Sequence, residues 1–171
     1  MPTITHITPN IATASQLDAA DFAQIAALGF RSVINNRPDA EPGAPVSSSQ
    51  ARQVAARAGL SYAYLPAPGH ALFDEDLLDA FDRALRELPG PVLVHCLTGT
   101  RSAILWALVT ARTAPVEGIL RILADAGLDI DFLEPQLQEQ SAAHGRETDA
   151  LPVPENRNCA VSPHAAIASP A

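Results

Sequence analysis

Hydrophobic and polar positions alternate along the chain between the period of a strand and the period of a helix. Short apolar or alternating runs predict five strands, at residues 3–8, 10–13, 32–35, 60–65 and 91–95. Apolar residues recurring every three or four positions predict helices that begin near residues 18, 47, 74, 101, 115 and 131. Because strands alternate with helices, we expect an α/β fold with a mostly parallel sheet and helices on both of its faces.

Capping and turn residues indicate where these helices begin and end. Asp18, Ser47 and Asp74 each precede a helical pattern and are expected to act as N-caps. Pro115 is expected at the first position of its helix, where the missing N–H has no partner to lose. The last helix is expected to run from about residue 131 to residue 143.

The character of the chain changes at about Gly145. Residues 145–171 hold four prolines among Ala, Ser and Asn and show no periodicity, so they are predicted to be a disordered Pro/Ala-rich tail. Residues 1–144 are therefore predicted to form one folded domain. Cys159 lies in the tail and is expected to be an incidental thiol, with a resolving thiol for Cys96 as the alternative.

Charge and composition narrow the classes of partner. The net charge is -8 at pH 7, which argues against nucleic acid and against an anionic membrane, because both need basic surface. The longest apolar run, at residues 103–109, is too short to cross a bilayer. Two cysteines make no disulfide framework and no apolar signal segment follows Met1, so a cytoplasmic location is expected.

The most informative stretch is P-V-L-V-H-C-L-T-G-T-R-S at residues 91–102, where a buried strand leads through a tight loop into an apolar helix. The first N–H groups of that helix have no intrahelical partner and favour an anion in the loop. A helix N-terminus and a nearby Arg both stabilise a thiolate, so Cys96 is expected to ionise readily. Arg101 offers a planar fork for an oxyanion. The residues expected to line the bound anion are Leu97, Thr98, Gly99, Thr100 and Ser102.

Two other loops are expected beside this one, because ligands of parallel sheets bind beyond the carboxyl ends of the strands. Arg37 lies on the loop after the strand at 32–35 and is a candidate second contact for the oxyanion, or else a solvated turn residue. Asp74, Asp76 and His70 follow the strand at 60–65 and are the candidates for a general acid. Asp74 is also explained simply as a helix N-cap.

Two polar residues beside the nucleophile have simpler interpretations. His95 is expected to lie at the end of its strand, with its ring satisfying a hydrogen bond of the loop. Ser102 is expected either to donate to the Cys96 thiolate or to cap the helix. Either role supports the anion site.

The pattern H-C-x-x-G-x-R-S resembles the active-site loops of two kinds of enzyme. Protein tyrosine phosphatases and dual-specificity phosphatases place five residues between the Cys and the Arg, and rhodanese-type sulfurtransferases place four. Four residues separate Cys96 from Arg101 in this chain, which is the rhodanese spacing.

Longer segments resemble one family more closely. The segments GFRSVINNRPDAEPGAP, AGLSYAYLP, PGPVLVHCLTGTRSAILWAL and ITPNIATASQLDAADF look like the phosphatase-like domain family found at the head of beta-lactamase-hydrolase-like proteins, over about residues 4–139. The resemblance implies an architecture like that of the dual-specificity phosphatases for a catalytic domain at residues 1–144. It also implies that Cys96 is the nucleophile and Arg101 the oxyanion ligand.

Two details of that resemblance bear on the site. The element N-R-P-x-x-E maps onto Asn36, Arg37, Pro38 and Glu41, on a loop expected beside the site. Leu97 stands where relatives usually carry Arg or another polar residue, so the resemblance gives no basis for a second cation at the mouth.

Three functions remain open from the sequence. The first is hydrolysis of a phosphomonoester, in which the Cys96 thiolate attacks phosphorus and Arg101 holds the oxyanion. The second is sulfur transfer, in which a Cys96 persulfide forms from a sulfane-sulfur donor and is removed by a thiol acceptor. The third is a non-catalytic oxyanion-binding module, which has no need of a low-pKa thiol. No cofactor is expected, and no Cys/His spacing indicates a metal site.

Overall fold

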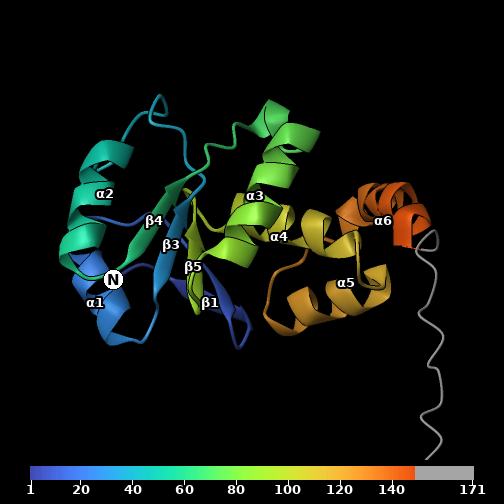
Figure 1. The fold of residues 1–171 in the computed structure, drawn as a ribbon, viewed down its shortest axis with the longest axis horizontal. Helices are drawn as coiled ribbons and strands as arrows, with labels where there is room; N and C mark the ends of the chain where they lie inside the picture. The colour runs from blue at the N-terminus through green and yellow to red at the C-terminus, as the bar shows by residue number, and fades with distance from the viewer. Residues whose placement is uncertain (149–171) are drawn as a thin grey trace, which may run out of the picture.

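The computed structural model describes residues 1–148, in which a five-stranded sheet separates two layers of helices (Figure 1). The strands are β1 (Ile4–Thr8), β2 (Ile11–Ala14), β3 (Ser32–Asn35), β4 (Ser61–Tyr64) and β5 (Val92–His95). Their order in the sheet is β1-β2-β5-β3-β4. β1 pairs antiparallel with β2, and the other neighbouring strands pair in parallel. The predicted α/β fold with a mostly parallel sheet is confirmed, and β5 lies at its centre.

The helices divide unequally between the two faces of the sheet. In Figure 1, α1 and α2 lie on one side of the strands, and α3 to α6 lie on the other. The α-helices are α1 (Asp21–Ala27), α2 (Ser48–Arg57), α3 (Glu75–Glu87), α4 (Thr100–Ala111), α5 (Val116–Asp125) and α6 (Glu134–Thr148). Two short 3₁₀ helices precede α3 and α6, namely η1 (Gly69–Ala71) and η2 (Asp131–Leu133). Nearly every residue of α4 is buried, because other helices and the sheet surround it.

The side chains of β5 alternate between two hydrophobic clusters. Leu93 packs in the cluster on the α1 and α2 face, which contains Phe22 of α1. Val94 packs in the larger cluster on the opposite face, which contains Phe81 of α3. Since neighbouring residues of a strand point to opposite faces, β5 is apolar on both sides and is held in the middle of the sheet. This holds the end of β5, where the next residue is Cys96, in a fixed position.

Helix boundaries differ from the sequence predictions in three places. Asp18 does not cap α1: its Oδ1 accepts from the backbone N–H of Ala20 at 2.9 Å, and that residue holds the N-cap position. Pro115 is the N-cap of α5 and not its first residue. The last helix continues to Thr148, past the predicted end at residue 143. The prediction for Ser47 is confirmed, because its side chain accepts from the N–H of Gln50 in a capping box.

The predicted start of the disordered tail at residue 145 is wrong, because residues 145–148 belong to α6. The predictions for residues 149–171, including those for Cys159, lie outside the described residues. Within residues 1–148 no helix has the length and the apolar character that are needed to cross a membrane.

Candidate active site

Cys96 is the first residue after β5, and its side chain is fully buried. The chain turns at once, so that the N-terminus of α4 faces the sulfur. The backbone N–H of Gly99 donates to the Cys96 Sγ at 3.2 Å. The strand, loop and helix predicted at residues 91–102 are therefore confirmed, and the thiol lies inside the turn that joins them.

Two opposing effects set the pKa of the Cys96 thiol. Burial raises the pKa, because a thiolate loses its hydration. The backbone N–H groups of Ser102, Gly99, Thr98 and Arg101 together outweigh burial, and they bring the pKa below its ordinary value. The direction agrees with the prediction that Cys96 ionises readily. The same converging N–H groups suit the oxygens of a tetrahedral oxyanion.

Gly99 allows the loop to close around the sulfur. Its φ of +97° lies in the left-handed region, and a Cβ added there would meet the Ala14 carbonyl oxygen at 3.4 Å. On the other side of the loop, Leu97 accepts a hydrogen bond through its carbonyl oxygen from the Gln16 N–H at 3.0 Å. The side chains of Leu97, Thr98 and Thr100 are exposed around the mouth of the loop. The contact of these three residues with a bound anion stays a prediction.

Arg101 is fixed by Glu41, which the resemblance places on a loop beside the site without predicting this pairing. Its Nη1 and Nη2 donate to the Glu41 Oε1 and Oε2 at 2.6 and 2.8 Å, and Nη1 also donates to the Ala67 carbonyl oxygen at 2.8 Å. A guanidinium carries five N–H donors in one plane, so two donors remain beyond these three bonds, and the Cys96 side chain is also a hydrogen-bond partner of Arg101. Cys96 is among the groups that raise the pKa of Arg101, after the hydrogen bond that Arg101 donates to Glu41. The guanidinium is thus held between Glu41 and Cys96.

The Arg37 guanidinium is hydrogen-bonded to other residues of the chain. Its Nη1 donates to the Gln16 Oε1 at 2.8 Å, its Nη2 donates to the Pro42 carbonyl oxygen at 2.6 Å, and its Nε lies 3.4 Å from the Glu41 Oε2. The residue is 4% exposed. The alternative that Arg37 is a solvated turn residue is therefore wrong. Its contact with an oxyanion stays a prediction, and these bonds favour a role in holding the loop that carries Glu41.

Asn36 joins three segments beneath the site. Its Oδ1 accepts from the Ser102 Oγ at 2.9 Å, and its Nδ2 donates to the Leu65 carbonyl oxygen at 2.9 Å. Its backbone N–H donates to the His95 carbonyl oxygen at 2.8 Å. The single hydroxyl hydrogen of Ser102 is used by Asn36, so it is the backbone N–H of Ser102 that acts on the thiolate. No signal in the sequence singled out Asn36 for this role.

His95 is buried directly before Cys96. Within residues 1–148 neither ring nitrogen has a hydrogen-bond partner. Burial is the main reason that the pKa of His95 is lowered to about 4; the backbone of Cys96 acts against this shift, and the charge of Arg37 acts with it. The predicted hydrogen bond from this ring to the loop is therefore wrong, and the ring is neutral at pH 7.

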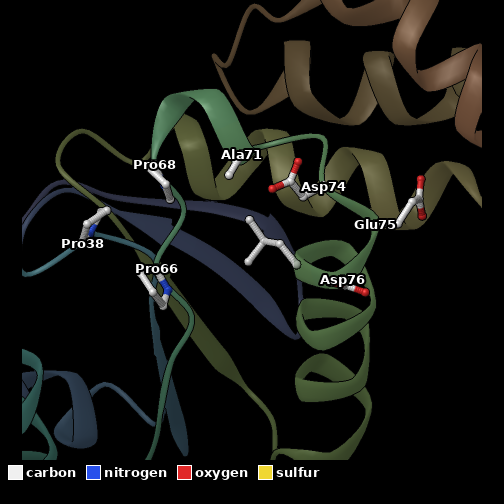
Figure 2. Close-up of a pocket in the computed structure, with 8 residues that line it drawn as sticks. Pro38, Pro66, Pro68, Ala71, Asp74, Glu75 and Asp76 are labelled. Carbon is white, nitrogen blue, oxygen red and sulfur yellow. The ribbon is translucent and has the colours of Figure 1, made fainter.

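An open cleft of about 710 Å³ runs from the loops after β3 and β4 to the start of α3 (Figure 2). The residues that line it are Pro38, Pro66, Pro68, Ala71, Asp74, Glu75, Asp76 and Leu77. The cleft borders the anion loop, because Ala67, whose carbonyl oxygen binds Arg101, lies between two of these prolines.

Asp74 and Asp76, two of the three candidate acids, line this cleft. Asp74 holds the N-cap position of α3, but its side chain makes no capping hydrogen bond. In Figure 2 its carboxylate lies beside Ala71, whereas those of Glu75 and Asp76 point away on the other side. His70 lies on η1 and is not among the lining residues. Of the three candidates, Asp74 has the carboxylate best placed to act within the cleft.

Metal ligation has no support in this part of the chain. Among residues 1–148 no group of three or more His, Cys, Asp or Glu side chains lies close enough to hold a metal ion.

The sequence matches one protein family over most of the chain. Residues 3–113 match the model of a family described as the phosphatase-like domain of beta-lactamase hydrolase-like proteins. A beta-lactamase hydrolase-like protein of Agrobacterium fabrum (strain C58) is 35% identical over 141 residues, a match that covers 81% of this chain and 32% of that protein. The chain thus spans about a third of the length of this relative.

Solved structures show the same architecture. A candidate phosphatase from Neisseria meningitidis Z2491 has a TM-score of 0.70 and 29% identity, and the match covers 80% of this chain and 97% of that chain. Tk-PTP in its active form has a TM-score of 0.60 and 18% identity, covering 85% and 98%, and shows the likeness of fold alone. The predicted fold like that of the protein tyrosine phosphatases is confirmed.

Proposed function

The chain belongs to the phosphatase-like domain family of beta-lactamase hydrolase-like proteins, and on that premise we propose that it hydrolyses a phosphomonoester with Cys96 as the nucleophile. The observation that carries the proposal is the convergence of backbone N–H groups on a thiol whose pKa is lowered. A thiolate and an oxyanion both gain from the same donors, so the loop that activates the sulfur also suits the phosphoryl group.

The reaction proceeds in two steps. In the first, the Cys96 thiolate attacks phosphorus, the S–P bond forms and the P–O bond to the leaving group breaks. Arg101 and the loop N–H groups bind the three remaining phosphoryl oxygens. In the second, water attacks the phosphocysteine, the S–P bond breaks, and inorganic phosphate leaves with Cys96 again a thiolate.

Asp74 supplies the proton in this scheme. Protonated Asp74 gives its proton to the leaving oxygen in the first step, and its carboxylate takes a proton from the attacking water in the second. Its place in the cleft beside the anion loop and its lack of a capping bond support this role. Glu41 touches neither the sulfur nor the phosphoryl group, and acts by holding Arg101.

Sulfur transfer is kept as a second candidate on one observation, the four residues between Cys96 and Arg101. The family model and the solved structures support the phosphatase interpretation instead. Both functions use the same thiolate, so the substrate and not the nucleophile separates them.

Two assays on the purified full chain test the proposal. The first measures release of 4-nitrophenol and phosphate from 4-nitrophenyl phosphate, with Cys96→Ser as the test variant and Cys159→Ser as the matched control. The second measures a persulfide on Cys96 by intact mass after treatment with thiosulfate. Phosphate release that Cys96→Ser abolishes and Cys159→Ser retains is the expected result. Persulfide without phosphate release would favour sulfur transfer, and silence in both would favour a binding module.

A further inference from the structure

A closed ring of hydrogen bonds joins the start of α3 to the end of α4 and the middle of α6. Arg112, directly after α4, donates from Nε to the Gln140 Oε1 at 3.1 Å and from Nη2 to the Glu75 Oε2 at 2.6 Å. Gln140 of α6 donates from Nε2 to the Glu75 Oε1 at 2.7 Å, which closes the ring. The remaining Nη1 of Arg112 donates to the Asp79 Oδ1 at 2.7 Å.

The members of this ring differ in how far they are buried. The side chain of Arg112 is 8% exposed, whereas those of Glu75 and Asp79 are 56% and 58% exposed. A buried guanidinium is tolerated only when its donors are paired, so Arg112 holds its partners in one arrangement. Gln140 is also buried, and its amide fixes the orientation of the Glu75 carboxylate from the other side. These bonds therefore hold the first turn of α3 in place at Glu75, its first residue.

That first residue directly follows Asp74. The side chain of Asp74 has no capping bond to hold it, so its position in the cleft depends on the backbone of its own turn. The backbone N–H of Asp74 donates to the Ala71 carbonyl oxygen at 3.1 Å, which sets one side of this turn. Glu75 sets the other side through Arg112 and Gln140.

We propose that the ring of Arg112, Glu75 and Gln140 is a positioning device that holds Asp74 in place as the general acid. The inference rests on the proposed phosphatase function, and it names three residues that act without touching the substrate. Gln140 lies outside residues 3–113, so this part of the device comes from a segment that the family model does not cover.

The test uses the dependence of the rate on the leaving group. A general acid matters for a poor leaving group such as phenol and little for a good one such as 4-nitrophenol. Gln140→Ala is therefore expected to lower kcat for phenyl phosphate by about tenfold, a fraction of what a general acid contributes, with little change for 4-nitrophenyl phosphate. Gln138→Ala, an exposed glutamine of the same helix, is the matched control. In the Asp74→Asn background, Gln140→Ala is expected to cause no further loss.

A second measurement does not depend on activity. Amide hydrogen exchange in residues 69–77 is expected to be faster in Gln140→Ala than in the wild type and in Gln138→Ala. Equal exchange, or an unchanged ratio of the two aryl phosphate rates, would overturn the proposal. If the wild type hydrolyses neither ester, the proposed function fails, and the exchange rates still decide whether the ring fastens this turn. If Gln140→Ala does not fold, Glu75→Gln takes its place with the same measurements.

Discussion

The Arg101 guanidinium and the Glu41 carboxylate form a bidentate ion pair across 60 residues of sequence, with N–O distances of 2.6 and 2.8 Å. The pair lies beside Cys96, and the hydrogen bond from Arg101 lowers the pKa of Glu41. Bidentate pairing fixes the plane of a guanidinium, and the plane decides whether its remaining N–H donors face an oxyanion. Glu41 is thus the positioning partner of the residue expected to bind the phosphoryl group.

Glu41→Gln is expected to lower kcat/KM for an aryl phosphate by about tenfold to a hundredfold, because a misplaced binding group costs rates of this order. The amide keeps one acceptor but turns an NH₂ group toward the guanidinium. The rate of Cys96 alkylation should change much less, since the backbone N–H groups that lower the thiol pKa stay in place. Glu87→Gln, at an exposed position at the end of α3, is the control. An unchanged kcat/KM would show that Glu41 does not position Arg101 for the reaction.

Gly99→Ala is expected to disturb the loop through the backbone. An L-residue at a φ of +97° is strained, by about 1–2 kcal/mol, and the new Cβ would lie 3.4 Å from the Ala14 carbonyl oxygen. Relief of that strain would move the Gly99 N–H away from the sulfur, so the thiol pKa should rise. The pH dependence of alkylation by iodoacetamide measures this pKa directly. Gly118→Ala, within α5 and with open space around its Cβ, is the control. Coinciding alkylation profiles of the wild type and Gly99→Ala would show that the Gly99 N–H does not lower the pKa of the thiol.

The sequence predicted the local features of this site well. The strand, the tight loop and the helix at Cys96 were predicted because each depends on neighbouring residues, through hydrophobic period and turn chemistry. The grouping of the three loops followed from the parallel topology, since the carboxyl ends of parallel strands meet at one edge. Asp74 was placed correctly at the start of α3, because an N-cap is a local signal.

The long-range pairings were not predictable in the same way. Nothing in the local pattern tells whether Arg37 faces solvent, a substrate or its own loop, since the answer depends on where Gln16 and Pro42 lie after folding. Ser102 was expected to donate to the thiolate or cap its helix, and its hydroxyl is instead taken by Asn36, 66 residues away. Side chains with several donors or acceptors take whichever partner the packing brings within reach, and the packing is a property of the whole fold.

His95 is expected to make the stability of the domain depend on pH. Burial lowers the pKa of His95 from 6.5 to about 4, so between these values the unfolded chain binds a proton that the folded chain does not. The neutral ring therefore costs the folded state nothing above pH 6.5, and the free energy of unfolding decreases as the pH falls toward 4. His95→Phe should therefore remove this part of the pH dependence, which amounts to a change of up to about 3 kcal/mol in the free energy of unfolding. Urea unfolding at several pH values measures it, and His70→Gln serves as control. Parallel curves for wild type and His95→Phe would show that the ring does not titrate this way.

Leu97 places an apolar side chain at the mouth of the site. It directly follows Cys96 and is 49% exposed. Arg101 is paired with Glu41, and Arg37 with Gln16 and Pro42. Because Leu97 makes its part of the rim apolar and the chain has a net charge of -8, we expect a phosphate monoester on an uncharged group to be preferred over a substrate with a second anionic group.

Leu97→Arg is accordingly expected to shift the preference toward substrates with an additional anionic group. A charge at an exposed rim adds about 1 kcal/mol at ~4 Å in water, or about fivefold in kcat/KM, and salt should screen the gain. The measurement compares a phosphotyrosine peptide with flanking Glu residues against one with flanking Gln residues, at low and high ionic strength. Leu97→Gln separates charge from polarity, because it removes the apolar rim and adds no charge. Equal ratios for the two peptides in wild type and in Leu97→Arg would mean that residue 97 does not contact the substrate beyond its phosphate.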